Sequence, residues 1–240
     1  MTKILLYELK RLLLNKFFFT LTVISGLYGY IILSSDIIIG VAYTAPFSPW
    51  SYGMYLARVL PLLLITALFF ITFLYSGQEK SVKQLTFATP VNLFRYCLVK
   101  CLAIAAGFLI ISLFVILISF VFYARIFRFF SFGAFIMPIL ITLIPGFLFI
   151  FGIGLLAGSV HSNILYVLMI AILLLGFFPL PHFFDIYGNN LFAAFPLTLP
   201  ARADGEPAFS LPVSFIAGKL FFSLAGIVMA YSGIKRYRNI

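Results

Sequence analysis

Charged side chains are scarce in this 240-residue chain. Only 9% of its residues are Asp, Glu, Lys or Arg, whereas 64% are hydrophobic, and the mean hydropathy is +1.18. A soluble domain carries about 25% charged residues, and a folded surface of ordinary size cannot hide so much apolar side chain from water. The composition therefore excludes a single water-soluble domain and predicts that lipid surrounds most of the chain.

Motifs of catalysis and energy conversion are also missing. The sequence has no G-x-x-x-x-G-K-[ST] phosphate-binding loop and no H-E-x-x-H metal motif. None of its six acidic residues falls in the middle of an apolar run, so it lacks the intramembrane carboxylate relay of proton-coupled transporters. We therefore expect no enzymatic activity and no cofactor, and any ATP hydrolysis would come from another protein.

Only two cysteines are present, Cys97 and Cys101, which excludes a disulfide framework. Their spacing places both on one face of a helix, where they could bridge a metal ion. No histidine or carboxylate lies near them in the sequence, so ordinary apolar packing is the favoured interpretation.

Six runs are long and apolar enough to cross about 30 Å of hydrocarbon as helices. They lie at residues 17–35, 59–77, 101–123, 132–158, 163–181 and 212–234, and only Lys219 interrupts one of them. The sequence therefore predicts an all-α, polytopic membrane protein with one transmembrane domain over residues 1–240. G-x-x-x-G spacing at Gly154 and Gly158, and the Gly226–Ala230 step, predict close helix contacts, either within the chain or between two copies.

Residues 3–16 are predicted to form an amphipathic helix at the membrane interface. One face of this helix is an apolar stripe of Leu5, Leu9, Leu12 and Leu13. The opposite side is basic and carries Lys3, Lys10 and Arg11. A cleaved signal peptide is the alternative. No A-x-A-like cleavage site follows the apolar run before Asp36, so we expect the segment to be retained.

Basic residues are unevenly divided between the two sides that six spans define. One side collects eleven of the sixteen: Lys3, Lys10, Arg11, Lys16, Lys80, Lys83, Arg95, Lys100, Lys235, Arg236 and Arg238. The other side holds Arg58, Arg125, Arg128, Arg202 and Lys219. The positive-inside rule therefore predicts that both termini are cytoplasmic, which an even number of spans satisfies. Because basic residues of membrane proteins report topology, nucleic acid is not an expected partner.

The connection between the second and third runs carries a short amphipathic pattern. Residues 78–87 are predicted to form a helix with Val82, Leu85 and Phe87 as its apolar contacts. The helix is expected to end before Thr89-Pro90, because a residue that precedes proline leaves the α region. Such a helix between two spans is either a handle for a cytoplasmic partner or a solvated segment that lies on lipid headgroups.

In this order, the features resemble the membrane subunit (permease) of a type-2 ABC exporter. The resemblance covers essentially the whole chain and rests on Glu8-Leu9-Lys10-Arg11, on Glu79, on Thr89-Pro90-Val91 and on Lys100. It implies that residues 3–16 are an elbow helix, with Glu8, Lys10 and Arg11, and that residues 78–87 are a coupling helix seated in a separate ATPase subunit. The implied ATPase contacts are Gln78, Glu79, Lys80, Val82, Lys83, Leu85, Phe87, Thr89 and Pro90.

The resemblance further implies two permease and two ATPase subunits in each transporter, in the plasma membrane. The chain departs from the family pattern at the connection of residues 159–162, which is very short and carries no full charge. The expected cargo is amphipathic or hydrophobic, such as an antimicrobial peptide, a drug or a lipid. A secondary transporter or channel is one rival interpretation, and a non-transporting membrane scaffold or sensor is another.

Two further features leave alternatives open. Residues 183–195 are apolar but too short to span, so they form either a re-entrant or interfacial helix or an ordinary surface loop. Lys219 lies about 10 Å inside the last run at 1.5 Å per residue. Its ammonium either snorkels to the outer headgroups or lies on an export path, where it would meet an anionic group.

Overall fold

The computed structural model describes residues 2–77, 79, 93–201 and 205–239. Its α-helices are α1 (Thr2–Leu13), α2 (Lys16–Ile32), α3 (Pro49–Leu74), α5 (Leu93–Ile126), α6 (Ile136–Val160), α7 (Ile164–Leu175), α8 (Asn189–Ala194) and α9 (Val213–Asn239). A π-helical turn, η1 (Leu33–Ile37), extends α2, and two 3₁₀ turns, η2 (Phe132–Phe135) and η3 (Phe195–Thr198), flank α6 and α8. Within the described residues, β pairing is limited to one isolated bridge between Ala201 and Pro207.

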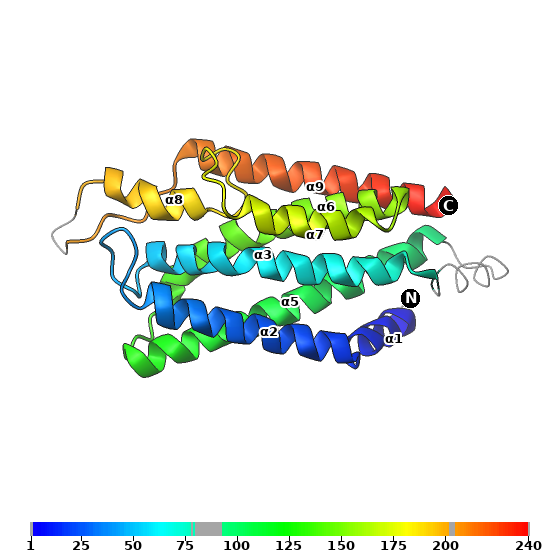
Figure 1. The fold of residues 1–240 in the computed structure, drawn as a ribbon, viewed down its shortest axis with the longest axis horizontal. Helices are drawn as coiled ribbons and strands as arrows, with labels where there is room; N and C mark the ends of the chain where they lie inside the picture. The colour runs from blue at the N-terminus through cyan, green and yellow to red at the C-terminus, as the bar shows by residue number, and fades with distance from the viewer. Residues whose placement is uncertain (1, 78, 80–92, 202–204, 240) are drawn as a thin grey trace.

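The long helices run along one axis of the molecule, and both chain termini lie at the same end (Figure 1). Among the described residues, five segments are long and apolar enough to cross a membrane: Lys16–Ile37, Pro49–Leu74, Phe94–Ile126, Phe132–Val160 and Val213–Tyr237. The chain is therefore an all-helical, multi-pass membrane protein.

A membrane span was predicted at residues 163–181, but α7 in this region has only 12 residues. At 1.5 Å per residue it is about 18 Å long, well short of the hydrocarbon thickness. Gly176 ends it, and Pro179 and Pro181 follow, so the apolar sequence continues without continuing the helix. Helix α7 and the turns after it nevertheless carry the chain to the end opposite the termini (Figure 1).

Helix α3 begins ten residues earlier than the expected span. Pro49 occupies the first turn, and the Ser48 hydroxyl oxygen accepts a hydrogen bond from the Ser51 amide at 3.1 Å, which caps the helix. Arg58, whose charge marked the expected boundary, lies within α3 and pairs with Asp36 of η1. The ion pair compensates the charge of Arg58.

Helix α3 forms the centre of the bundle, and most of its side chains are buried. Small residues let other helices approach closely. A Cβ at Gly226 of α9 would lie 2.3 Å from the Leu148 carbonyl oxygen of α6, and one at Gly152 would lie 2.1 Å from the Gly226 oxygen. Gly154 and Gly158 of α6 pack against side chains of α3 and the residue that follows it. The small-residue steps therefore serve contacts within the chain.

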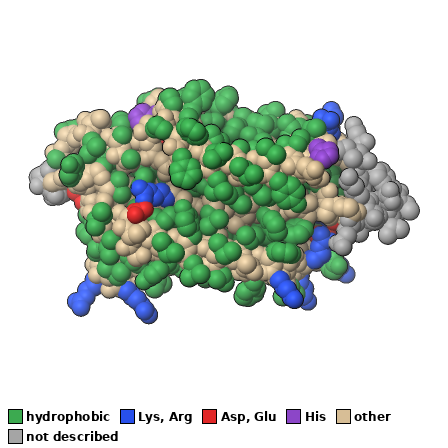
Figure 2. Space-filling view, in the orientation of Figure 1, with side chains coloured by type: hydrophobic (Ala, Val, Ile, Leu, Met, Phe, Trp, Pro, Cys, Tyr) green, Lys and Arg blue, Asp and Glu red, His purple; other side chains and the backbone are tan. Residues whose placement is uncertain are grey.

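Hydrophobic side chains cover the middle of the face seen in Figure 2, while Lys and Arg side chains gather towards its two ends. Leu27 of α2, Leu109 of α5 and Leu224 of α9 are among the large apolar side chains left exposed. Such a surface suits contact with lipid acyl chains.

Candidate functional site: a buried ion-pair cluster

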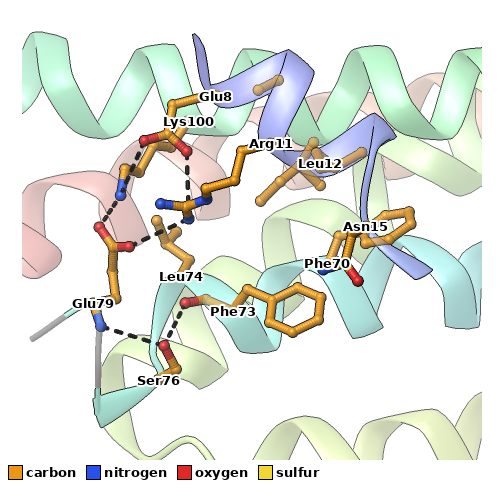
Figure 3. Close-up of a pocket in the computed structure, with 12 residues that line it drawn as sticks. Glu8, Arg11, Leu12, Asn15, Phe70, Phe73, Leu74, Ser76, Glu79 and Lys100 are labelled. Carbon is orange, nitrogen blue, oxygen red and sulfur yellow. Dashed lines mark hydrogen bonds and ion pairs between the residues drawn. The ribbon is translucent and has the colours of Figure 1, made fainter. Parts of the chain in front are cut away.

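Four charged side chains from three parts of the chain meet near the end of the bundle that carries the termini (Figures 1 and 3). Glu8 and Arg11 lie one turn apart on α1, so they share a face of that helix. Glu79 follows α3, and Lys100 lies two turns inside α5. We call these four residues the ion-pair cluster.

Each carboxylate of the ion-pair cluster contacts both cations. The Arg11 Nη2 atom lies 3.4 Å from Glu8 Oε2 and 3.5 Å from Glu79 Oε2. The Lys100 Nζ atom lies 3.7 Å from Glu8 Oε1, and it donates a hydrogen bond to Glu79 Oε1. The formal charges sum to zero, which is the condition under which charges are tolerated away from water.

Neighbouring groups hold the cluster in place. The Tyr96 hydroxyl donates to Glu79 Oε1 at 3.3 Å, and its ring lies 4.5 Å from the Lys100 ammonium. The Glu79 amide donates to the Ser76 hydroxyl oxygen at 3.4 Å. Glu8, Glu79 and Lys100 are buried, whereas the Arg11 side chain is 49% exposed. The cluster therefore ties α1, the residue after α3 and α5 to one another.

A cavity of about 360 Å³ adjoins the ion-pair cluster (Figure 3). The four charged side chains line one part of it, and Asn15 and Ser76 add polar groups elsewhere in the lining. The apolar lining consists of Leu12, Phe70, Phe73, Leu74, Ala103 and Ile104. The cavity can accept a molecule that has both a polar and an apolar part.

Glu79 was predicted to contact an ATPase partner directly, but in the structure it binds other residues of its own chain. Its carboxylate is turned inward and engaged by Arg11, Lys100 and Tyr96. Arg11, expected on the side of α1 opposite the leucine stripe, also reaches into the cluster, while Lys10 is exposed. The other residues predicted to contact an ATPase, Gln78, Lys80, Val82, Lys83, Leu85, Phe87, Thr89 and Pro90, lie outside the described residues.

Lys219 is buried within the protein rather than extended to headgroups. Its side chain is 2% exposed, its Nζ donates to the Ile186 carbonyl oxygen, and it lies 4.7 Å from the Phe215 ring centroid. The segment that supplies this carbonyl is itself fixed, because the Asp185 carboxylate accepts from the amides of Gly188 and Asn190 at 2.7 and 2.9 Å. Lys219 therefore anchors the segment before α8 to α9.

The same segment is held to α7 by Tyr187. Its hydroxyl donates to the Ile172 carbonyl oxygen at 2.8 Å. Burial, followed by the charge of Asp185, raises the pKa of this phenol well above its ordinary value. The phenol therefore stays protonated and remains a hydrogen-bond donor.

Cys97 and Cys101 are both buried with free thiols. In the part of the chain that the structure describes, no group of three or more His, Cys, Asp or Glu side chains could hold a metal ion. Both cysteine side chains belong to the buried hydrophobic core.

Tyr96 and Ser76 were not singled out by the sequence, although both support Glu79. Tyr96 lies one turn before Lys100 on α5, and Ser76 lies three residues before Glu79. That spacing to a charged residue is the signal that could have found them.

Comparison of the chain with protein-family models, with curated proteins and with solved structures finds no match.

Proposed function

We propose that this chain is the permease subunit of an ATP-driven exporter of the type-2 ABC class, with ATP hydrolysis in a separate subunit. The observation that carries the proposal is the ion-pair cluster. It connects α1, the residue after α3 and α5, which are the elements that flank the segment expected to meet the ATPase.

The cluster supports a mechanical role for the connection between α3 and α5. In the sequence, residues 80–92 link Glu79 to the start of α5, and they lie outside the described residues. A partner that moves this segment acts on Glu79, and through it on Arg11 of α1 and Lys100 of α5. In the proposed cycle, closure of the ATPase subunits moves these elements together and switches the membrane subunits between inward-facing and outward-facing states.

The bonding partners of the acidic side chains support an ATP-driven rather than a proton-driven mechanism. Glu8 and Glu79 are paired within the cluster, and Asp36 pairs with Arg58. Asp185 accepts from backbone amides, and Glu206 accepts from the Ala45 amide at 2.7 Å. Each described carboxylate thus has a structural partner, whereas a proton relay needs carboxylates that exchange protons during the cycle.

The assembly and cargo in this proposal follow the family resemblance. Two permease subunits and two ATPase subunits form the transporter, in the plasma membrane with the chain termini in the cytoplasm. Helix α7 and the turns after it provide the sixth crossing. An amphipathic or hydrophobic cargo, such as an antimicrobial peptide, a drug or a lipid, suits the aromatic and weakly charged interior.

The test is purification of the tagged chain from its native membranes, with assay of cargo-stimulated ATPase activity in the purified complex. Leu85→Ala should reduce the yield of the ATPase subunit or uncouple hydrolysis from cargo, because deletion of a buried leucine costs about 2–5 kcal/mol at a contact. Glu79→Ala should do the same and also lower the stability of the permease alone, since Glu79 is held inside it.

Leu102→Ala is the matched control, because Leu102 lies exposed on α5 and away from the cluster. It should leave both the yield and the stimulation unchanged. Proton-driven cargo transport by the permease alone in liposomes would overturn the proposal, as would an unchanged yield and unchanged stimulation in the Leu85→Ala variant.

A further inference from the structure

The cavity beside the ion-pair cluster has no role in the cycle proposed above. Its volume of about 360 Å³ falls within the range of about 300–1,000 Å³ typical of small-molecule sites. It lies between α1 and the last two turns of α3, with α5 behind it (Figure 3). Because α1 is amphipathic and α3 is a membrane span, this is the level at which headgroups meet acyl chains.

The partly exposed lining residues show where the cavity opens. Arg11 is half exposed, and Asn15, Phe73 and Ser76 are partly buried. The cavity therefore opens along the junction of α1 and α2, next to the end of α3. A membrane lipid can enter there with its acyl chain on Phe70 and Phe73 and its headgroup near Arg11.

The charged wall retains capacity to bind a ligand. Both contacts of Arg11 within the cluster use Nη2, so Nη1 and Nε can donate to an oxyanion at the opening. The Glu8 carboxylate contacts its partners at 3.4 and 3.7 Å, longer than the roughly 2.7–2.9 Å of a charge-assisted hydrogen bond. Glu8 can therefore accept a closer hydrogen bond from a cationic donor.

The balance of charge in the cluster selects the kind of headgroup. Two carboxylates and two cations already compensate one another, so a ligand with a net charge would bring an unpaired charge into a partly buried site. A zwitterion adds no net charge and offers a partner to each sign. We propose that the cavity binds one zwitterionic phospholipid with a phosphate and a primary ammonium, the phosphate on Arg11 and the ammonium on Glu8.

The proposal is tested by titrating the purified full-length chain in detergent with a diacyl phosphoethanolamine lipid and counting bound lipid by native mass spectrometry. We expect one lipid per chain, bound at least about tenfold more tightly than phosphocholine or phosphoglycerol lipids with the same acyl chains. The choline headgroup has no N–H group to donate to Glu8, and the phosphoglycerol headgroup carries a net charge. Equal affinity for the three headgroups would overturn the assignment.

Variants locate the site without removing the ion-pair cluster. Ala103 is a buried lining residue on α5, so Ala103→Phe fills the cavity and should abolish the preferential binding, whereas Leu102→Phe on the exposed side of α5 should leave it intact. A second variant, Asn15→Asp, keeps a carbonyl-type oxygen to cap α2 and places a negative charge at the opening. It should weaken binding several-fold. Preferential binding that persists in a folded Ala103→Phe or Asn15→Asp protein would overturn the site.

Discussion

Lys100 is the buried cation of the ion-pair cluster, and its ammonium contacts both carboxylates. It is buried, and the cost of removing an ion from water is several kcal/mol unless that ion is paired. Arg11 can replace it only in part, since the Arg11 side chain is half exposed and its attraction for the carboxylates is reduced by solvent. The two cations are therefore not equivalent in their contribution to stability.

Lys100→Met should lower the stability of the permease by about 3–5 kcal/mol, because it leaves Glu8 and Glu79 facing each other with one half-exposed cation between them. Thermal unfolding of the purified chain in detergent measures the change. Lys10→Met is the matched control, since Lys10 is exposed on α1, and its effect should stay within about ±0.5 kcal/mol. Equal melting temperatures of the two variants would show that the cluster does not stabilise the fold.

The convergence of these four residues could be predicted only in part. The spacing of Glu8 and Arg11 on a helix, and the positions of Glu79 and Lys100 at the ends of apolar runs, were visible in the sequence. Their meeting depends on the packing of α1 against α5, which periodicity does not specify. Lys219 was singled out in the sequence, but its partner could not be predicted for the same reason, because the Ile186 carbonyl belongs to a different segment that packs against α9.

At the scale of helices, the closest backbone approach described above is between α6 and α9. Gly152 and Gly226 lie where the two backbones meet, and a Cβ on either would overlap backbone atoms of the other helix. Backbone atoms cannot rotate away as a flexible side chain can. This contact therefore requires glycine for steric reasons.

Gly226→Ala should destabilise the helix pair by about 1–3 kcal/mol, the usual cost of overpacking, and lower the melting temperature in detergent. Gly133→Ala is the control, because a Cβ at Gly133 meets no atom within 4 Å. If Gly226 instead lay at a contact between two copies of the chain, the substitution would change the oligomeric state and leave the stability of the monomer unchanged. That outcome would contradict the assignment of this glycine to packing within the chain.

Helix existence was easier to predict than helix length. Apolar runs marked the long helices because lipid demands about 20 apolar residues for each span. Their ends moved where local chemistry intervened: Ser48 and Pro49 start α3 early, and Gly176 stops α7 within an apolar run. A hydropathy pattern cannot separate an apolar helix from apolar turns, so residues 176–181 were expected to be helical and are not.

For the whole molecule, the position of the termini constrains the topology. Both lie at one end of the bundle, so the chain passes along its length an even number of times (Figure 1). In the part of the chain that the structure describes, five helices are long enough to span, and the proposed sixth crossing falls to α7 with the turns after it. Under the positive-inside rule, the distribution of basic residues in the sequence predicts that this end is cytoplasmic.

Single-cysteine labelling of intact cells tests this orientation. A membrane-impermeant thiol reagent added outside should modify Asp204→Cys, because residues 179–212 are predicted to be external, and should leave Lys83→Cys unmodified until the cells are permeabilised. Cys97 and Cys101 are buried, so they should contribute little background, and a variant with both replaced by alanine provides the reference. Labelling of Lys83→Cys alone from outside would invert the protein in the membrane. It would also remove the connection between α3 and α5 from the reach of a cytoplasmic ATPase, and with it the coupling mechanism proposed for the ion-pair cluster.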